Sequence, residues 1–158
     1  MRRSAGLLLF RRSERGTEVL LGHMGGPFFA RRDAGAWSVP KGEYGPEEPA
    51  LDAARREFQE ELGLPPPEGE TVPLGEVTQA NGKIVTVWAM EADLDPATVV
   101  PGTFRMEWPR GSGRVQEFPE LDRVEWLPLD RARALLIKAQ TEFLDRLEGH
   151  TGGREMPL

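Results

Sequence analysis

Residues 49–62 constrain the chain more than any other segment, because they predict an amphipathic helix with two distinct faces. On a helical wheel of about 100° per residue, one stripe is apolar and suits a protein core. This stripe consists of Leu51, Ala54, Phe58 and Leu62. A second sector gathers the carboxylates of Glu57, Glu60 and Glu61. Like charges at this spacing repel one another, and a divalent cation would relieve the repulsion, but by itself the pattern is more typical of a solvated acidic face than of a cation site.

The segments on both sides of this helix favour the metal site. Residues 37–43 read WSVPKGE, and Gly63 stands where a helix can end in left-handed geometry. Residues 42–64, GEYGPEEPALDAARREFQEELGL, resemble the Nudix box over all 23 positions. The box reads G-x5-E-x7-R-E-U-x-E-E-x-G-U, where U is a bulky apolar residue. Its fixed positions correspond to Gly42, Glu48, Arg56, Glu57, Glu60, Glu61 and Gly63. One position departs mildly, because Phe58 stands where Leu, Ile or Val is usual.

The resemblance to Nudix hydrolases implies a metal centre. In that family the box holds Mg²⁺ or Mn²⁺ against a diphosphate, so the expected ligands are Glu57, Glu60 and Glu61. A backbone carbonyl near Gly42 is expected to add a ligand. Arg56 is expected to pair with a box glutamate and to orient it.

The resemblance also implies one more acid from a loop beyond the sheet. In many relatives this acid stands six residues before a Trp that begins the last strand, which here selects Glu120 before Trp126. Glu117 is the rival. The catalytic base, which takes a proton from the attacking water, is expected to be Glu60 or Glu57, with Glu120 next.

Phosphate binding needs cationic side chains. Lys41, directly before the box glycine, is expected to contact substrate phosphate, and Arg31 and Arg32 are candidates for the distal phosphates. Candidates for the same role also lie in a glycine-rich stretch: Arg105, Arg110 and Arg114. For all five arginines, a solvated position on the surface is the commoner alternative. Stacking of a nucleobase is open to Phe28, Phe29 and Trp108, although packing within the protein is the commoner role of such side chains.

Composition excludes several other classes of function. The net charge of −6 disfavours nucleic acid as a partner. The chain has no cysteine and only two histidines, far apart in sequence, which excludes thiolate chemistry and disfavours a histidine-based metal centre. No apolar run is long enough for a transmembrane helix, and the apolar residues 5–10 are too few for a signal peptide. We expect no membrane partner, a cytoplasmic location, and a monomer or homodimer.

The order of the predicted elements indicates an α/β fold. Strands are expected at 5–10, 18–24, 74–79, 83–91, 103–108 and 123–127, and helices at 49–62 and within 129–147. The resemblance implies the Nudix-type α/β/α sandwich, with a mixed β-sheet and the loop-helix-loop of the box. Trp37 is expected in the core beneath the box. A single Nudix hydrolase domain over residues 1–150 and a flexible C-terminal tail over residues 151–158 are expected.

The expected activity is a Mg²⁺-dependent pyrophosphohydrolase that cleaves a phosphoanhydride bond in a nucleoside diphosphate derivative. The sequence WSVPKGE resembles the start of the box in hydrolases of dinucleoside polyphosphates and of nucleoside triphosphates, so these are the expected substrates. The alternative is a Nudix-fold module that senses a nucleotide without cleaving it. Such modules typically lose box glutamates, whereas this chain keeps them.

Overall fold

The computed structural model describes residues 2–155, and the side chains of residues 2–151. Its elements in chain order are β1 (Arg3–Ser13), β2 (Gly16–Met24), β3 (Trp37–Ser38), β4 (Lys41–Glu43), α1 (Ala50–Leu62), β5 (Val72–Thr78), β6 (Ile84–Glu91), η1 (Pro96–Thr98), β7 (Thr103–Glu107), β8 (Val115–Pro119), β9 (Leu121–Pro128), α2 (Leu129–Leu135), η2 (Lys138–Gln140) and α3 (Thr141–Glu155).

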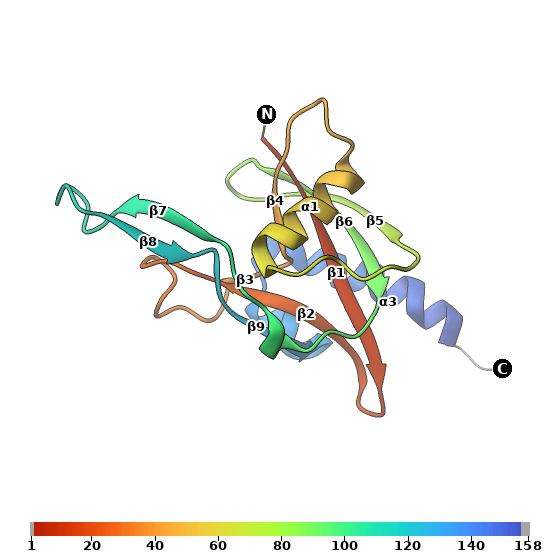
Figure 1. Ribbon diagram of the computed structural model, residues 1–158. Coiled ribbons are helices and arrows are strands. Elements are labelled where there is room, and N and C mark those ends of the chain that lie inside the picture. The colour runs from red at the N-terminus through yellow and green to blue at the C-terminus, as the bar shows by residue number, and fades with distance from the viewer. Residues whose placement is uncertain (1, 156–158) are drawn as a thin grey trace.

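A mixed sheet forms the centre of the molecule, as the sequence predicts. Its main strand order is β3-β2-β1-β6-β5, with β4 paired to β1 and β9 paired to β2. Strands β1 and β6 run parallel, whereas the other pairs in this sheet are antiparallel. Helix α1 covers one face of the sheet, and the C-terminal helices cover the other (Figure 1). The expected α/β/α sandwich is therefore confirmed.

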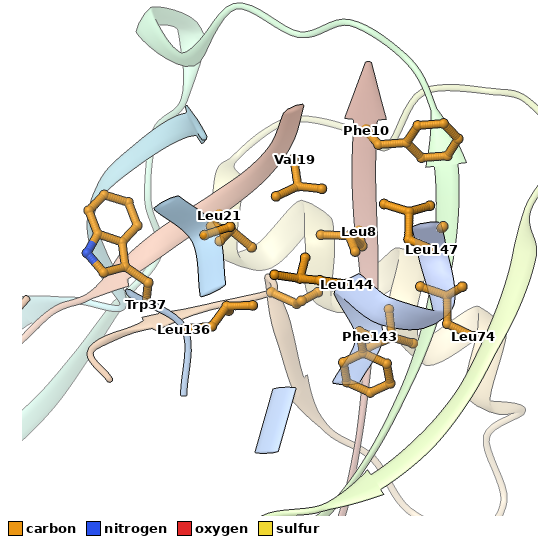
Figure 2. Packing of buried hydrophobic residues seen from close by; sticks show 14 of the residues in the cluster. Leu8, Phe10, Val19, Leu21, Trp37, Leu74, Leu136, Phe143, Leu144 and Leu147 are labelled. Carbon is orange, nitrogen blue, oxygen red and sulfur yellow. The ribbon is translucent and has the colours of Figure 1, made fainter. Parts of the chain in front are cut away.

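Two hydrophobic cores hold these layers together, and β1 contributes to both. Leu7 and Leu9 pack with α1. Leu8 and Phe10 point to the other face and pack with α3, as Figure 2 shows. Burial on both faces explains why residues 5–10 form a continuous apolar run instead of an alternating one. Trp37 is buried, but it belongs to the core that α3 covers, so the expectation that it lies beneath the box is wrong.

A two-stranded ribbon, β7–β8, projects from the body of the molecule (Figure 1). The sequence predicts its first strand but not its second. The missed strand, β8, has mostly polar, exposed residues before Phe118, so it lacks the alternation that marks a half-buried strand.

The last helix is longer than the predicted helical range, residues 129–147. Helix α3 continues to Glu155, and Thr151 is buried, with its hydroxyl donating to the Leu147 carbonyl at 3.1 Å. The helical structure therefore extends past residue 150. Residues 156–158 of the expected tail lie outside the described residues. Within the part of the chain that the structure describes, no helix is long and apolar enough to cross a membrane.

Candidate active site

Helix α1 presents its acidic face because the opposite face is anchored in the core. Its buried side chains are Ala53, Ala54, Phe58 and Leu62. At the C-terminal end, Gly63 adopts a left-handed conformation (φ 70°), and its N–H donates to the Gln59 carbonyl at 2.8 Å. The next segment is tied down as well, because the N–H of Val100 donates to the Leu62 carbonyl at 2.8 Å. The glutamates of α1 therefore stand on a helix that is held at its end and along one side.

Strand β4 lies directly against the carboxylates of α1. A Cβ atom on Gly42 would lie 1.8 Å from Oε1 of Glu57, so only glycine leaves room for this carboxylate. The N–H of Lys41 donates to Oε1 of Glu61 at 3.1 Å. The segment WSVPKGE therefore contacts the acidic face of α1 with the backbone of Lys41 and Gly42.

Arg56 connects three glutamates. Its guanidinium donates to both carboxylate oxygens of Glu48 at 2.8 and 2.9 Å, to Glu57 at 2.7 Å and to Glu60 at 3.1 Å. This geometry agrees with the orienting role that the box resemblance implies, and it gives Glu48 a structural partner. Arg56 itself lines none of the cavities described below.

The structure brings Glu120 to the cluster and leaves Glu117 outside it. Glu120 lies between β8 and β9, where its N–H donates to the Gly102 carbonyl at 2.7 Å. Its side chain faces the same small cavity as the box glutamates, which has a volume of about 180 Å³ and is lined by Glu57, Glu60, Glu61, Gly102, Thr103 and Glu120. Glu117 is exposed on β8 and accepts from the Thr103 hydroxyl at 3.1 Å.

Burial and mutual repulsion make these charges unfavourable as they stand. Burial raises the pKa of Glu57, and the nearby charge of Glu60 raises it further. Burial also raises the pKa of Glu120, and it raises that of Glu61 to about 8. The pKa of Lys41 is lowered, first by burial and then by the positive charge of Lys83. A cation between the carboxylates would relieve the repulsion among them.

The donor atoms suit a hard divalent cation, since the cluster offers carboxylate oxygens and no sulfur or imidazole ligand. No trio of His, Asp or Glu side chains within residues 2–151 is already arranged to hold an ion. In the present arrangement Arg56 engages Glu57 and Glu60, while the N–H of Lys41 engages Glu61. The donor set of these carboxylates is the kind that a hard divalent cation takes, and they would have to turn from those donors into the cavity to bind one.

Two larger cavities adjoin the acidic cluster. One, of about 220 Å³, is mostly apolar away from the cluster and is lined by Met24, Gly25, Phe29, Ser38, Lys41, Glu61, Phe104, Glu120 and Leu121. The other, of about 300 Å³, is polar and is lined by Ser4, Lys41, Gly42, Glu43, Glu57, Glu61, Lys83 and Glu120. Sequence reasoning assigned no role in the site to Phe104, Ser4 or Lys83. A signal for Phe104 is its position on the alternating strand 103–107, whereas nothing local marks Ser4.

Most of the predicted phosphate and base contacts lie away from these cavities. Neither Arg31 nor Arg32 lines any of the three, and their role stays a prediction. The same holds for the arginines of the ribbon, Arg105, Arg110 and Arg114. Phe28 is 52% exposed and packs edge-on against Trp108, with ring centroids 5.4 Å apart. Of the three predicted stacking residues, only Phe29 lines the apolar cavity.

Comparison with known proteins places the chain in a family. The family model described as NUDIX domain matches residues 1–147. No curated protein matches the chain.

Solved structures share the fold. A Caenorhabditis elegans Ap4A hydrolase in a binary complex aligns with a TM-score of 0.65 and 21% identity, over 97% of this chain and 99% of that one. RenU, a Nudix hydrolase from Mycobacterium smegmatis, aligns at 0.59 and 24% over 98% and 87%. The NUDIX domain of Shewanella oneidensis NrtR, in complex with ADP ribose, aligns at 0.61 and 14% over 94% and 87%.

Proposed function

Because the chain belongs to the Nudix family of hydrolases, we propose that it is a pyrophosphohydrolase that uses Mg²⁺ or Mn²⁺ to cleave a phosphoanhydride bond in a nucleotide. One observation carries the proposal. Four carboxylates, Glu57, Glu60, Glu61 and Glu120, line one cavity. Lys41 lines both adjoining cavities, and one of these adds apolar side chains. This arrangement suits a substrate with a hydrophobic end and a linked pair of phosphates.

The glutamates and Lys41 have different roles in the proposed reaction. When bound, a divalent cation supplies charge neutralisation for the diphosphate and makes water more acidic. Glu60 or Glu57, with Glu120 as the next candidate, accepts the proton of the attacking water. A raised pKa suits Glu57 and Glu120 to that task. Lys41 holds a phosphate oxygen through its ammonium group.

The apolar cavity supports a nucleoside as the other part of the substrate. Phe29 and Phe104 line it from two separate segments, and aromatic rings suit a planar base. Nucleoside triphosphates and dinucleoside polyphosphates are the proposed substrates. The structural neighbour described as an Ap4A hydrolase and the neighbour in complex with ADP ribose support a nucleotide ligand.

A panel of nucleotides tests the proposal. We expect the protein with Mg²⁺ to hydrolyse nucleoside triphosphates or dinucleoside polyphosphates, with products identified by chromatography. Glu60→Gln is expected to lower kcat by about 10²-fold or more, because it removes a charge that both cation binding and proton transfer need, while the far-UV circular dichroism spectrum is unchanged. Full Mg²⁺-dependent activity in this variant would remove Glu60 from the site.

The same panel separates the enzyme from a nucleotide-sensing module without turnover, which would bind a nucleotide and release no product. A cytoplasmic location and a monomeric or homodimeric state complete the proposal. Light scattering coupled to size-exclusion chromatography measures the second.

A further inference from the structure

The polar cavity contains a pair of lysines that the proposed chemistry uses only in part. Lys41 belongs to β4, and Lys83 directly precedes β6. Strand β1 separates these two strands in the sheet and contributes Ser4, which lies opposite Glu43 on one side and opposite Val85 on the other. Pairing of three strands therefore brings two ammonium groups and one hydroxyl to a single cavity.

The cavity contains a larger share of the lysines than of the arginines of this chain. The chain has only three lysines among its 20 basic residues, and two of them line this cavity. The side chain of Lys83 is 15% exposed, and its Nζ lies 3.0 Å from Oε2 of Glu43. An ammonium group has three donors, so this ion pair leaves two of them for another partner. Glu43 thereby holds Lys83 in place at the wall of the cavity.

Ser4 adds a second, independent observation. It is fully buried, it lines the same cavity, and its hydroxyl has no hydrogen-bond partner within the described part of the chain. Buried hydroxyl groups nearly always have a partner, because an unpaired one loses its hydration without compensation. This hydroxyl therefore keeps an unused donor at the wall of a cavity that two lysines also line.

The three cavities share part of their walls. Glu61 and Glu120 line all of them, and Lys41 lines both the apolar and the polar cavity, so these two cavities meet at the acidic cluster and at Lys41. A nucleoside in the apolar cavity would place its first phosphates at the cluster. Any further phosphate would then extend toward Lys83.

We propose that Lys83 and Ser4, together with Lys41, form a subsite for the phosphate farthest from the bound nucleoside, so that the protein selects substrates with three or more linked phosphates. This inference rests on the proposed function. The carboxylates that also line the cavity repel a bare anion, so the subsite takes phosphate only together with the divalent cations.

ATP and ADP form a matched pair of probes, because they differ by a single phosphate. With Mg²⁺, we expect Lys83→Met to raise the KM for ATP about tenfold, equivalent to about 1.4 kcal/mol, and to change the KM for ADP less than twofold. Lys83→Arg retains the charge and should restore most of the ATP affinity. Lys138→Met, which removes the third lysine from a cavity that shares no lining residue with the three described above, is the control and should change neither KM.

Ser4→Ala separates binding from folding. Removal of an unpaired buried hydroxyl should leave the Tm unchanged or raise it, while the KM for ATP rises about threefold. A lowered Tm with an unchanged KM would overturn the role of Ser4. Equal changes in both KM values for Lys83→Met, or no change in either, would overturn the subsite.

Binding without turnover keeps this test separate from that of the proposed function. If the wild type hydrolyses no nucleotide, the proposed activity fails, and titration calorimetry with inorganic tripolyphosphate and Mg²⁺ still tests the subsite. Lys83→Met should then weaken tripolyphosphate about tenfold and pyrophosphate less than twofold. Equal affinities of wild type and variant for tripolyphosphate would overturn the proposal.

Discussion

At the scale of single residues, the site depends on where side chains are absent as much as on where they are present. Gly42 is needed because the Glu57 carboxylate occupies the space that a Cβ would fill. The obstacle is the end of a flexible side chain and not backbone, so the carboxylate can move away at small cost to the fold. A substitution of Gly42 should therefore affect the reaction more than the stability of the fold.

We expect Gly42→Ala to lower kcat at least tenfold, because the new methyl group displaces Glu57 from the cluster, while the Tm changes little. Steady-state kinetics and thermal unfolding measure the two effects. Gly45→Ala is the matched control, since no atom lies within 4 Å of the Cβ it would add. Wild-type kinetics in Gly42→Ala would show that the position of Glu57 does not limit the reaction.

At the scale of elements, the glycine at the end of α1 is expected to matter for stability more than for the reaction itself. Gly63 has a positive φ of 70°, and a Cβ there would lie 2.3 Å from the Val100 carbonyl oxygen. Both features involve backbone, which has little freedom to move. This junction joins α1 to the segment that leads to Gly102 and the ribbon, so it positions the helix relative to the Glu120 loop.

Gly63→Ala is expected to lower the free energy of unfolding by about 1–3 kcal/mol, through left-handed strain and the clash with Val100. Urea denaturation followed by circular dichroism measures this loss. Gly82→Ala serves as a control for the strain alone, because Gly82 also has a positive φ but no atom within 4 Å of the added Cβ. Equal losses in the two variants would contradict a contribution from the clash.

At the scale of the whole molecule, folding concentrates negative charge at one end of the sheet. Residues about 60 positions apart in sequence, on α1 and on the loop before β9, share one cavity. The cost of this arrangement depends on pH, since burial raises the pKa of Glu61 from 4.5 to about 8. Between these values the folded protein keeps a proton that the unfolded chain has lost.

The free energy of unfolding of the metal-free protein is therefore expected to fall as pH rises from about 5 to about 8. Chemical denaturation in the presence of a chelator measures this slope. Glu61→Gln should reduce the slope, because the amide does not titrate and still accepts the Lys41 N–H. Mg²⁺ should stabilise the wild type more at pH 8 than at pH 5, since it binds the ionised carboxylates. A Glu61→Gln variant with the wild-type slope would assign the pH dependence to other groups.

Much of this site could be predicted because its main parts are local in sequence. Helical periodicity and box spacing place Glu57, Glu60 and Glu61 on one face of α1, and the structure shows that face directed at a cavity. The resemblance predicts Glu120 from its spacing to Trp126, and in the structure Glu120 lines the cavity of the box glutamates whereas Glu117 does not. Boundaries were less predictable, as the missed strand β8 and the length of α3 show.

The sequence by itself determined the sandwich class, the acidic helix and the family, because these depend on patterns repeated within a few turns or strands. Only the tertiary structure decided that Ser4 and Lys83 share a cavity with Lys41, and that Phe104 faces Phe29's cavity while Arg31 and Arg32 face none of the three. The physical reason is that such neighbours result from pairing between distant strands. Their energy comes from burial and backbone hydrogen bonds spread over the whole sheet, and no short segment encodes it.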